Sequence, residues 1–347
     1  MTSAAPEGGV GAVRIAVVGP SFFSYMQAVV DEFGRRGMPG LWFDERHSNS
    51  ALTKVVYRLG FGRFRPGPRR RHLSTILQGI RDHGATDVLL ISVEVVDTEF
   101  VTALHREGIR VHLYLWDSVA NKVGADKLVK LIGNKATFDP IDSETYGMPY
   151  IPLFAEATFD EATLKPSGPY DYDIGFCGTV HSSRSAVFAQ LVRARWAQRL
   201  RLKLMLYYQS RAILYIRGLA DRNLWPLIPR ISTRMFLKPQ VAEMIGKTRF
   251  ILDIPHPGQS GMTMRTFEVL LAGSRLLTFN RIAAARLPQA LQSRVRVISQ
   301  ISDVTQIDFE QCERMPPLTA DERYYVSLER FVDQLMAMMQ LAPSKAA

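Results

Sequence analysis

Short runs of Val, Ile and Leu recur along this chain, and a helical pattern separates each run from the next. Such runs fit strands that are buried on both faces of a parallel sheet, because a half-exposed strand would alternate apolar and polar residues. Successive parallel strands need a crossover connection, which is usually a helix. The alternation stops once, near the middle of the chain, and then restarts. The sequence therefore predicts an α/β protein built from two Rossmann-like domains.

The first series of elements precedes a linker expected at 148–159. Its strands are expected at 13–19, 40–44, 87–93, 109–117 and 134–139, and its helices at 21–36, 72–83, 98–107 and 122–132. In the second series, strands are expected at 172–178, 201–206, 249–254, 275–279 and 295–299, and helices at 183–199, 239–246, 262–272 and 321–341, with an irregular or helical stretch at 210–235.

Composition narrows the class of protein. The chain has 347 residues, of which 47% are hydrophobic, which suits two globular domains. No run approaches the roughly 18 apolar residues of a membrane span, and the first residues lack the pattern of a secretory signal. Cys177 and Cys312 have no metal-binding spacing and are too few for a disulfide framework, so both are expected to be thiols. We expect a cytoplasmic protein.

The net charge of +10 indicates an anionic partner. Cations and aromatic residues interleave in 54–71, a pattern typical of attachment to an anionic membrane surface. A proline pair, Pro66 and Pro68, should break any long helix there and leave a short amphipathic element and a basic loop. A second basic zone covers 193–238, where 193–203 is read as a solvated face. Zinc-finger, RNP-type and helix-turn-helix patterns are not evident, so we expect no nucleic-acid partner.

A polar loop between a buried strand and an amphipathic helix is the most informative local feature. Gly258 and Gly261 bracket this loop, so backbone N–H groups there can approach an anion. The following helix would add unpaired N–H groups and the positive end of its dipole. The candidate binding residues are His256, Gln259, Ser260, Gly261, Met262, Thr263, Arg265, Thr266 and Glu268. The order of strand, loop and helix indicates a phosphate-binding site.

Two charged residues of that helix suggest the nature of the ligand. Arg265 lies in the first turn, where it opposes the helix dipole unless an anion such as a diphosphate is bound nearby. Glu268 lies about one turn further along, on the same face, and could bind ribose hydroxyls. The alternative is an exposed i,i+3 ion pair worth roughly 0.2–0.5 kcal/mol.

The sequence from Asp253 to Asn280, DIPHPGQSGMTMRTFEVLLAGSRLLTFN, resembles the donor-binding region of bacterial GT-B glycosyltransferases. It is most similar to the group-1 and spore-maturation-like enzymes of polysaccharide and lipopolysaccharide assembly. A second match, YDIGFCGTVHSSRSAVFAQL from Tyr172, resembles the start of their C-terminal domain. In these enzymes the turn after that first strand contacts the donor phosphates. The resemblance places these contacts on Gly178, Thr179, Ser182, Ser183 and Arg184.

The resemblance implies two Rossmann-like domains that face a cleft, with a C-terminal helix that crosses back to the N-terminal domain. An acceptor-binding domain would cover 12–153, and a nucleotide-sugar-binding domain would cover 154–320. The helix at 321–341 would be the returning one. No further cofactor is implied beyond the nucleotide-sugar donor, which is a co-substrate.

The catalytic base is expected at the carboxyl end of a strand in the first domain. Many retaining members carry a glutamate at the position of Ser260, and its absence here favours inversion with a carboxylate base. Asp117 and Glu94 both follow buried strands, and Asp117 is the first choice. A helix cap or an Asx turn is the alternative role for Asp117, and a packed edge carboxylate is the alternative for Glu94.

Metal-independent transfer is expected, because Arg184, Arg265 and the helix terminus can offset the charge of the departing diphosphate. The leading hypothesis is a glycosyltransferase that moves a sugar from a nucleotide-sugar donor to a glycan or glycolipid acceptor. It would work in the cytoplasm at the inner face of the cell membrane. The alternatives are an inactive nucleotide- or sugar-binding protein of the same fold and a basic nucleic-acid-binding module.

Overall fold

The computed structural model describes residues 13–21, 24–46, 66–164, 168–180, 184–256 and 258–342. The chain forms two compact units that interleave along the sequence. The first contains the chain up to Leu115, Lys122–Lys135 and the residues from Met336 onward. The second contains Trp116–Asn121 and Ala136–Leu335. Because the units interleave, the domain limits of 12–153, 154–320 and 321–341 stay predictions.

The first unit is built on a sheet with the strand order β2-β1-β3-β4-β5, in which the pairs β1–β2, β1–β3 and β3–β4 are parallel. Its strands are β1 (Ile15–Gly19), β2 (Gly40–Asp44), β3 (Asp87–Ile91), β4 (Arg110–Leu115) and β5 (Asn134–Thr137). Every residue of β1 and β3 is buried, as the apolar runs at 15–18 and 88–91 predict, and the burial includes Asp87 at the start of β3. The direction of winding reverses between β1 and β3.

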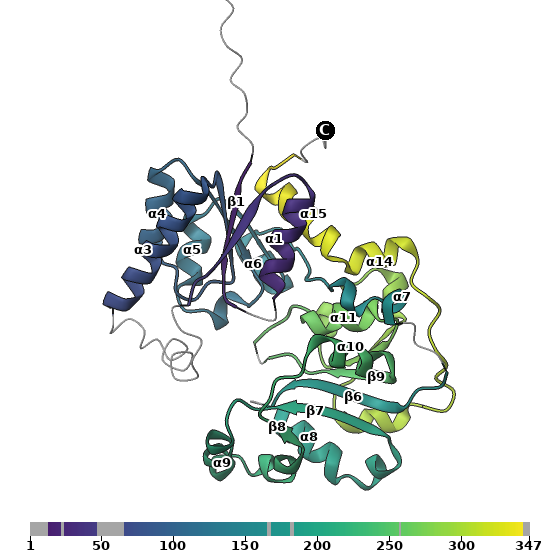
Figure 1. Cartoon of the computed structure of the whole chain (residues 1–347). Coiled ribbons are helices and arrows are strands. Elements are labelled where there is room, and N and C mark those ends of the chain that lie inside the picture. Colours follow the sequence, from purple (N-terminus) through teal and green to yellow (C-terminus); the bar gives the residue numbers. More distant parts are fainter. Residues whose placement is uncertain are drawn as a thin grey trace, which may run out of the picture. The chain divides into compact units, whose positions relative to one another are not determined.

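That reversal decides where the helices lie. Right-handed crossovers put the connection from β1 to β2 on one face and the later connections on the other. Figure 1 shows α3, α4 and α5 side by side along one side of the sheet, with α1 on the other side. The helices are α1 (Tyr25–Arg35), α3 (Pro66–His83), α4 (Thr98–Arg106) and α5 (Ala125–Leu131).

The second unit is built on a sheet with the order β11-β10-β9-β6-β7-β8. Its strands are β6 (Tyr172–Thr179), β7 (Leu202–Tyr207), β8 (Ile231–Ser232), β9 (Thr248–Asp253), β10 (Arg275–Thr278) and β11 (Val295–Val297), and all neighbouring pairs are parallel. Two strand series run outward in opposite directions from the central pair β6–β9, which is the dinucleotide-binding strand order. Figure 1 shows these strands with their flanking helices.

Helices and 3₁₀ turns make up the rest of the second unit. Its α-helices are α6 (Pro140–Tyr146), α7 (Glu161–Leu164), α8 (Arg184–Arg193), α9 (Arg211–Ala220), α10 (Lys238–Gly246), α11 (Met264–Leu271), α12 (Arg281–Ala284), α13 (Gln289–Gln292) and α14 (Ala320–Val326). Its 3₁₀ turns are η2 (Val119–Asn121), η3 (Ala157–Phe159), η4 (Arg195–Arg199), η5 (Arg222–Arg230) and η6 (Ile301–Gln306). The last helix, α15 (Leu328–Met339), begins in the second unit, and its residues from Met336 belong to the first. The predicted fold class, with two Rossmann-like units and a returning C-terminal helix, is confirmed.

The C-terminal helix differs from the prediction of one continuous helix over 321–341. The chain breaks at Ser327, whose backbone is extended and pairs with Ala155 as a β-bridge. The Ser327 hydroxyl then accepts a hydrogen bond from the Arg330 N–H and so caps the start of α15. A long-range backbone pairing therefore overrides a continuous apolar pattern.

The start of α3 also differs from the prediction. Pro66 and Pro68 were expected to break the helix, but both lie in its first turn, where a missing N–H group costs nothing. Arg69, which belongs to the predicted 54–71 membrane segment, donates to the backbone oxygen of Val95 and to Asp97 within the first unit. Residues 54–65 of that segment lie outside the described residues.

Candidate functional site

The carboxyl ends of β6 and β9 lie next to each other at the point where the second sheet reverses direction. Ligands of doubly wound sheets collect at such a point, because the loops from the two central strands diverge there. The candidate residues Gly178 and Thr179 are the last two residues of β6, and both are half-buried. The other candidates of the second unit are Arg184, which begins α8, and the loop and helix residues that follow β9.

Arg184 ties these two strand ends together. Its Nε and Nη2 atoms donate to the backbone oxygen of Ile254, at 3.0 and 2.5 Å, and Nη1 donates to that of Thr179 at 3.2 Å. Burial lowers the pKa of Arg184, although the nearby Asp253 opposes this effect. The guanidinium has five N–H donors, so these bonds leave some of its donor capacity for a ligand.

A buried carboxylate that sequence reasoning missed organises the start of α11. Asp253 accepts hydrogen bonds from the hydroxyls of Thr263, at 2.9 Å, and Thr266, at 3.2 Å. Burial raises the pKa of Asp253, while Arg184 counteracts the rise. Because the Thr263 hydroxyl is turned toward Asp253, no side chain of the described residues caps α11. The first-turn N–H groups of this helix therefore suit an anion.

Arg265 and Glu268 form an ion pair, with Nη1 of Arg265 at 2.5 Å from Oε2 of Glu268. The pair is not the exposed one that the sequence left open, because Glu268 is only 1% exposed and Arg265 is 21% exposed. A buried carboxylate with a cationic partner is costly unless further groups satisfy it. The two residues lie where the sequence predicted them, on one face at the start of the helix.

The loop before α11 is held firmly by polar side chains from other strand ends. Asp139 accepts a hydrogen bond from the backbone N–H of Ser260 at 2.9 Å and another from its hydroxyl. Asn280 donates from its side-chain amide to the backbone oxygens of Ser260 and Gly261. Burial alone would raise the pKa of Asp139, but the hydroxyls of Ser118 and Ser260 hold it below its ordinary value. These bonds fix the positions of Ser260 and Gly261 in the loop.

Gly261 meets protein rather than open space. A Cβ atom there would overlap the ring of Phe138 and lie 2.7 Å from the Phe138 backbone oxygen. The sequence predicted that Gly261 would let the backbone approach an anion. In the structure its missing side chain allows the close approach of Phe138, and Met262 beside it is buried.

The structure brings one predicted base to the predicted donor loop. Gln259 is half-buried, and its side-chain amide donates to Oδ1 of Asp117 at 2.9 Å. His256, three residues earlier, is exposed. Asp117 is half-buried and belongs to the segment Trp116–Asn121 of the second unit. The contact places a carboxylate next to the loop, as a base for a ligand held there would require.

The second predicted base, Glu94, lies in the first unit and is paired with two cations. Arg46 donates to it at 2.9 Å, and Nζ of Lys122 donates at 2.6 Å. Burial alone would raise the pKa of Glu94, but Lys122 and Arg46 hold it below its ordinary value. A carboxylate stabilised in this way is a weak proton acceptor.

Glu45, which the sequence analysis did not select, lies next to this group and is fully buried. Its carboxylate accepts hydrogen bonds from the backbone N–H groups of Glu94 and Val95, at 2.8 and 2.7 Å. Burial raises the pKa of Glu45 to about 7, even though these N–H groups oppose the rise. Its position directly after β2 was the available signal in the sequence.

Several candidates have no structural outcome. Ser182 and Ser183 lie outside the described residues. Cys177 and Cys312 are both free thiols, as expected. Within the described part of the chain, no group of three His, Cys, Asp or Glu residues is arranged to hold a metal ion. None of the described helices has the length and apolar character that crossing a bilayer requires.

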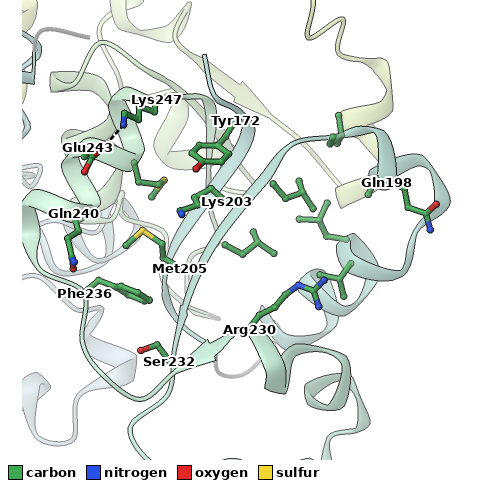
Figure 2. Close-up of a pocket in the computed structure, with 17 residues that line it drawn as sticks. Tyr172, Gln198, Lys203, Met205, Arg230, Ser232, Phe236, Gln240, Glu243 and Lys247 are labelled. Atoms are coloured by element: carbon green, nitrogen blue, oxygen red, sulfur yellow. Dashed lines mark hydrogen bonds and ion pairs between the residues drawn. The ribbon is translucent and has the colours of Figure 1, made fainter. Parts of the chain in front are cut away.

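A large cavity of about 960 Å³ lies elsewhere in the second unit. Figure 2 shows Tyr172 and Lys203 near an ion pair between Glu243 of α10 and Lys247, the residue that follows this helix. Tyr172 begins β6 and Lys203 is the second residue of β7, so this cavity borders the amino ends of the strands. Size alone does not make it the site, because ligands of such sheets bind at the carboxyl ends.

Several solved structures superpose on this chain over nearly its whole length. The trehalose-phosphate synthase (UDP-forming) of Burkholderia xenovorans, in complex with glucose-6-phosphate, superposes with a TM-score of 0.63 at 12% identity, over 94% of this chain and 100% of that one. The sucrose-phosphate synthase of Thermosynechococcus elongatus superposes with a TM-score of 0.60 at 10% identity, over 94% of this chain and 98% of that one. The UDP-GlcNAc 2-epimerase of Neisseria meningitidis, bound to UDP-GlcNAc, superposes with a TM-score of 0.53 at 9% identity, over 94% of this chain and 100% of that one.

These similarities extend over nearly the whole chain and show that its fold is the GT-B fold. No protein-family model matches the sequence, and no curated protein matches it either. The spore-maturation-like family that the sequence resembles is therefore not established by these comparisons.

Proposed function

We propose that this chain is a glycosyltransferase that takes a sugar from a nucleotide-sugar donor. The observation that carries the proposal is the position of the predicted donor residues at the reversal point of the second sheet, between β6 and β9. The first turn of α11 would bind the diphosphate, and Arg265 would compensate its charge. The buried Glu268 would then accept hydrogen bonds from the ribose hydroxyls.

The acceptor and the reaction course extend this proposal. The acceptor is a glycan, carried on a lipid in the cell-surface polysaccharide pathways to which the sequence resemblance points. Asp117 would accept the proton of the acceptor hydroxyl, because its carboxylate lies against Gln259 of the loop. Transfer would then invert the configuration and need no metal. The protein would act in the cytoplasm, at the inner face of the cell membrane.

Nucleotide binding tests the proposal most directly. We expect one of UDP, GDP, CMP and dTDP to raise the melting temperature, because a ligand at about a hundred times its Kd adds roughly 2.7 kcal/mol to stability. Glu268→Gln should weaken binding of that nucleotide at least about tenfold, because an amide is a weaker acceptor for ribose hydroxyls than a carboxylate. Glu243→Gln is the matched control, since it alters an exposed glutamate–lysine pair on α10. A protein that none of the four nucleotides stabilises would contradict the proposal.

A second candidate function is epimerisation of the nucleotide sugar itself. It is favoured by the similarity to the Neisseria meningitidis enzyme bound to UDP-GlcNAc. The two reactions differ in what they require, because an epimerase converts the nucleotide sugar alone and a transferase needs an acceptor. Incubating the protein with the sugar conjugate of the stabilising nucleotide, without acceptor, distinguishes the two reactions. Formation of an epimeric nucleotide sugar would support epimerisation and contradict the transferase proposal.

A further inference from the structure

Helix α9 turns its apolar stripe away from the protein. Its apolar residues recur at i, i+3, i+4 and i+7, a spacing that normally faces a core. Here the residues with this spacing are all exposed. They are Ala212, Tyr215, Ile216 and Leu219, and the last two are 66% and 78% exposed. The buried side of α9 is formed by Leu214 and Gly218.

The neighbouring turn η5 extends this surface and keeps it rigid. Trp225 is 46% exposed, and its indole N–H donates to the backbone oxygen of Gly218 at 2.9 Å. Its ring lies against Gly218, where a Cβ atom would be 3.5 Å away, and is 6.2 Å from the ring of Tyr215. Figure 1 shows α9 at one end of the second unit, near β8. We call Tyr215, Ile216, Leu219 and Trp225 the α9 face.

The exposed charged residues of α9 and of the start of η5 are all positive. Arg211, Arg217 and Arg222 are exposed, and within the described residues no acidic side chain pairs with them. Asp221 is the acidic residue of 211–240, and its carboxylate is occupied by the Ser185 hydroxyl and the Asn223 N–H. Exposed apolar and aromatic side chains framed by arginines are typical of helices that lie in a membrane interface.

We propose that the α9 face docks onto an anionic lipid bilayer. The aliphatic side chains would enter the boundary between headgroups and acyl chains, while the arginines would contact lipid phosphates. Tyr215 and Trp225 suit this depth, because each has an apolar ring with a polar group at its edge. The surface is distinct from the 54–71 segment and from the candidate donor site, so it does not depend on the proposed function.

Vesicle sedimentation of the full chain tests this proposal. We expect the protein to bind vesicles of phosphatidylglycerol and phosphatidylcholine more tightly than vesicles of phosphatidylcholine alone, with an affinity that falls as salt rises. The double variant Ile216→Ser/Leu219→Ser should weaken binding at least about tenfold. Arg211→Gln/Arg217→Gln should remove much of the preference for phosphatidylglycerol.

Val123→Ser and Ile282→Ser are the matched controls, because each removes an exposed aliphatic side chain outside α9, 66% and 50% exposed respectively. Both should bind vesicles like the wild type. Failure of the wild-type protein to bind anionic vesicles would overturn the proposal. Unchanged vesicle binding by the Ile216/Leu219 variant would also overturn it and would favour 54–71 as the membrane-binding segment. Self-association that this variant abolishes, measured by sedimentation velocity, would instead make the α9 face an interface between copies. Nucleotide stabilisation should persist in every variant, so failure here leaves the donor proposal intact.

Discussion

The carboxyl ends of the two sheets use buried acids in different ways. After β2 and β3, Glu94 forms ion pairs with Arg46 and Lys122. Glu45 accepts hydrogen bonds from backbone N–H groups. After β9, Asp253 engages two threonine hydroxyls, and the start of α11 is left without a side-chain cap among the described residues. We call these regions the first edge and the second edge.

The difference shows that position at a strand end does not by itself predict a chemical role. Glu94 and Asp117 both follow buried strands of the first sheet, and the sequence selected both by that position, with Asp117 as the first choice. Two cations engage the Glu94 carboxylate, whereas the Asp117 carboxylate accepts a hydrogen bond from Gln259 of the loop. Two carboxylates that follow neighbouring strands therefore have different surroundings.

Turnover gives the largest expected contrast between these acids. Asp117→Asn should lower kcat by about 10²–10⁴, the usual contribution of a general base, while still accepting the hydrogen bond from Gln259. Glu94→Gln should retain most activity. The measurement is single-turnover transfer at saturating donor, with nucleotide stabilisation as the check that the donor site is intact. The opposite ranking of the two variants would move the base to the first edge.

The pH dependence of stability distinguishes Glu45 from ordinary glutamates. Its pKa rises from 4.5 to about 7 on folding. Between these values the native protein keeps a proton that the unfolded chain has released, so this contribution to stability falls as pH rises. The shift corresponds to about 3 kcal/mol. As pH rises from 4.5 to about 7, the unfolding free energy of Glu45→Gln should therefore increase by about 3 kcal/mol relative to that of the wild type. Urea unfolding at several pH values measures this difference.

Glu243→Gln serves as the reference for that experiment, because its carboxylate is exposed and paired with Lys247. Its unfolding free energy should follow the wild-type curve in the same window. Parallel curves for wild type and Glu45→Gln would mean that Glu45 titrates normally and that the first edge is more open than the structure indicates.

The packing of the second edge gives the smallest of the three effects. Gly261→Ala should destabilise the protein by about 1–3 kcal/mol, because the new methyl group would overlap Phe138. Gly133→Ala is the control, since a Cβ atom there meets no described atom within 4 Å, and it should change stability by less than about 1 kcal/mol. Thermal unfolding measures both. Equal stability of the two variants would show that the loop can move away from Phe138.

The sequence predicted the architecture well because strand burial and helix periodicity are local properties. The apolar runs of β1, β3 and β9 and the polar start of α11 lie where they were expected. The sequence did not reveal that Asp139 and Phe138 hold the loop, because Asp139 and Ser260 are 121 residues apart. A glycine needed for a ligand and a glycine needed for a phenyl ring also look identical in sequence.

The hydrogen bonds that Asp139, Asn280 and Asp117 make to the loop before α11 have a consequence for the energetics of recognition. A loop that is already ordered loses little conformational entropy when a ligand arrives, so more of the contact energy is retained as affinity. Calorimetry should then show a modest entropic penalty for nucleotide association. Substrate discrimination at this loop would depend on shape complementarity with a stiff template, rather than on an induced rearrangement.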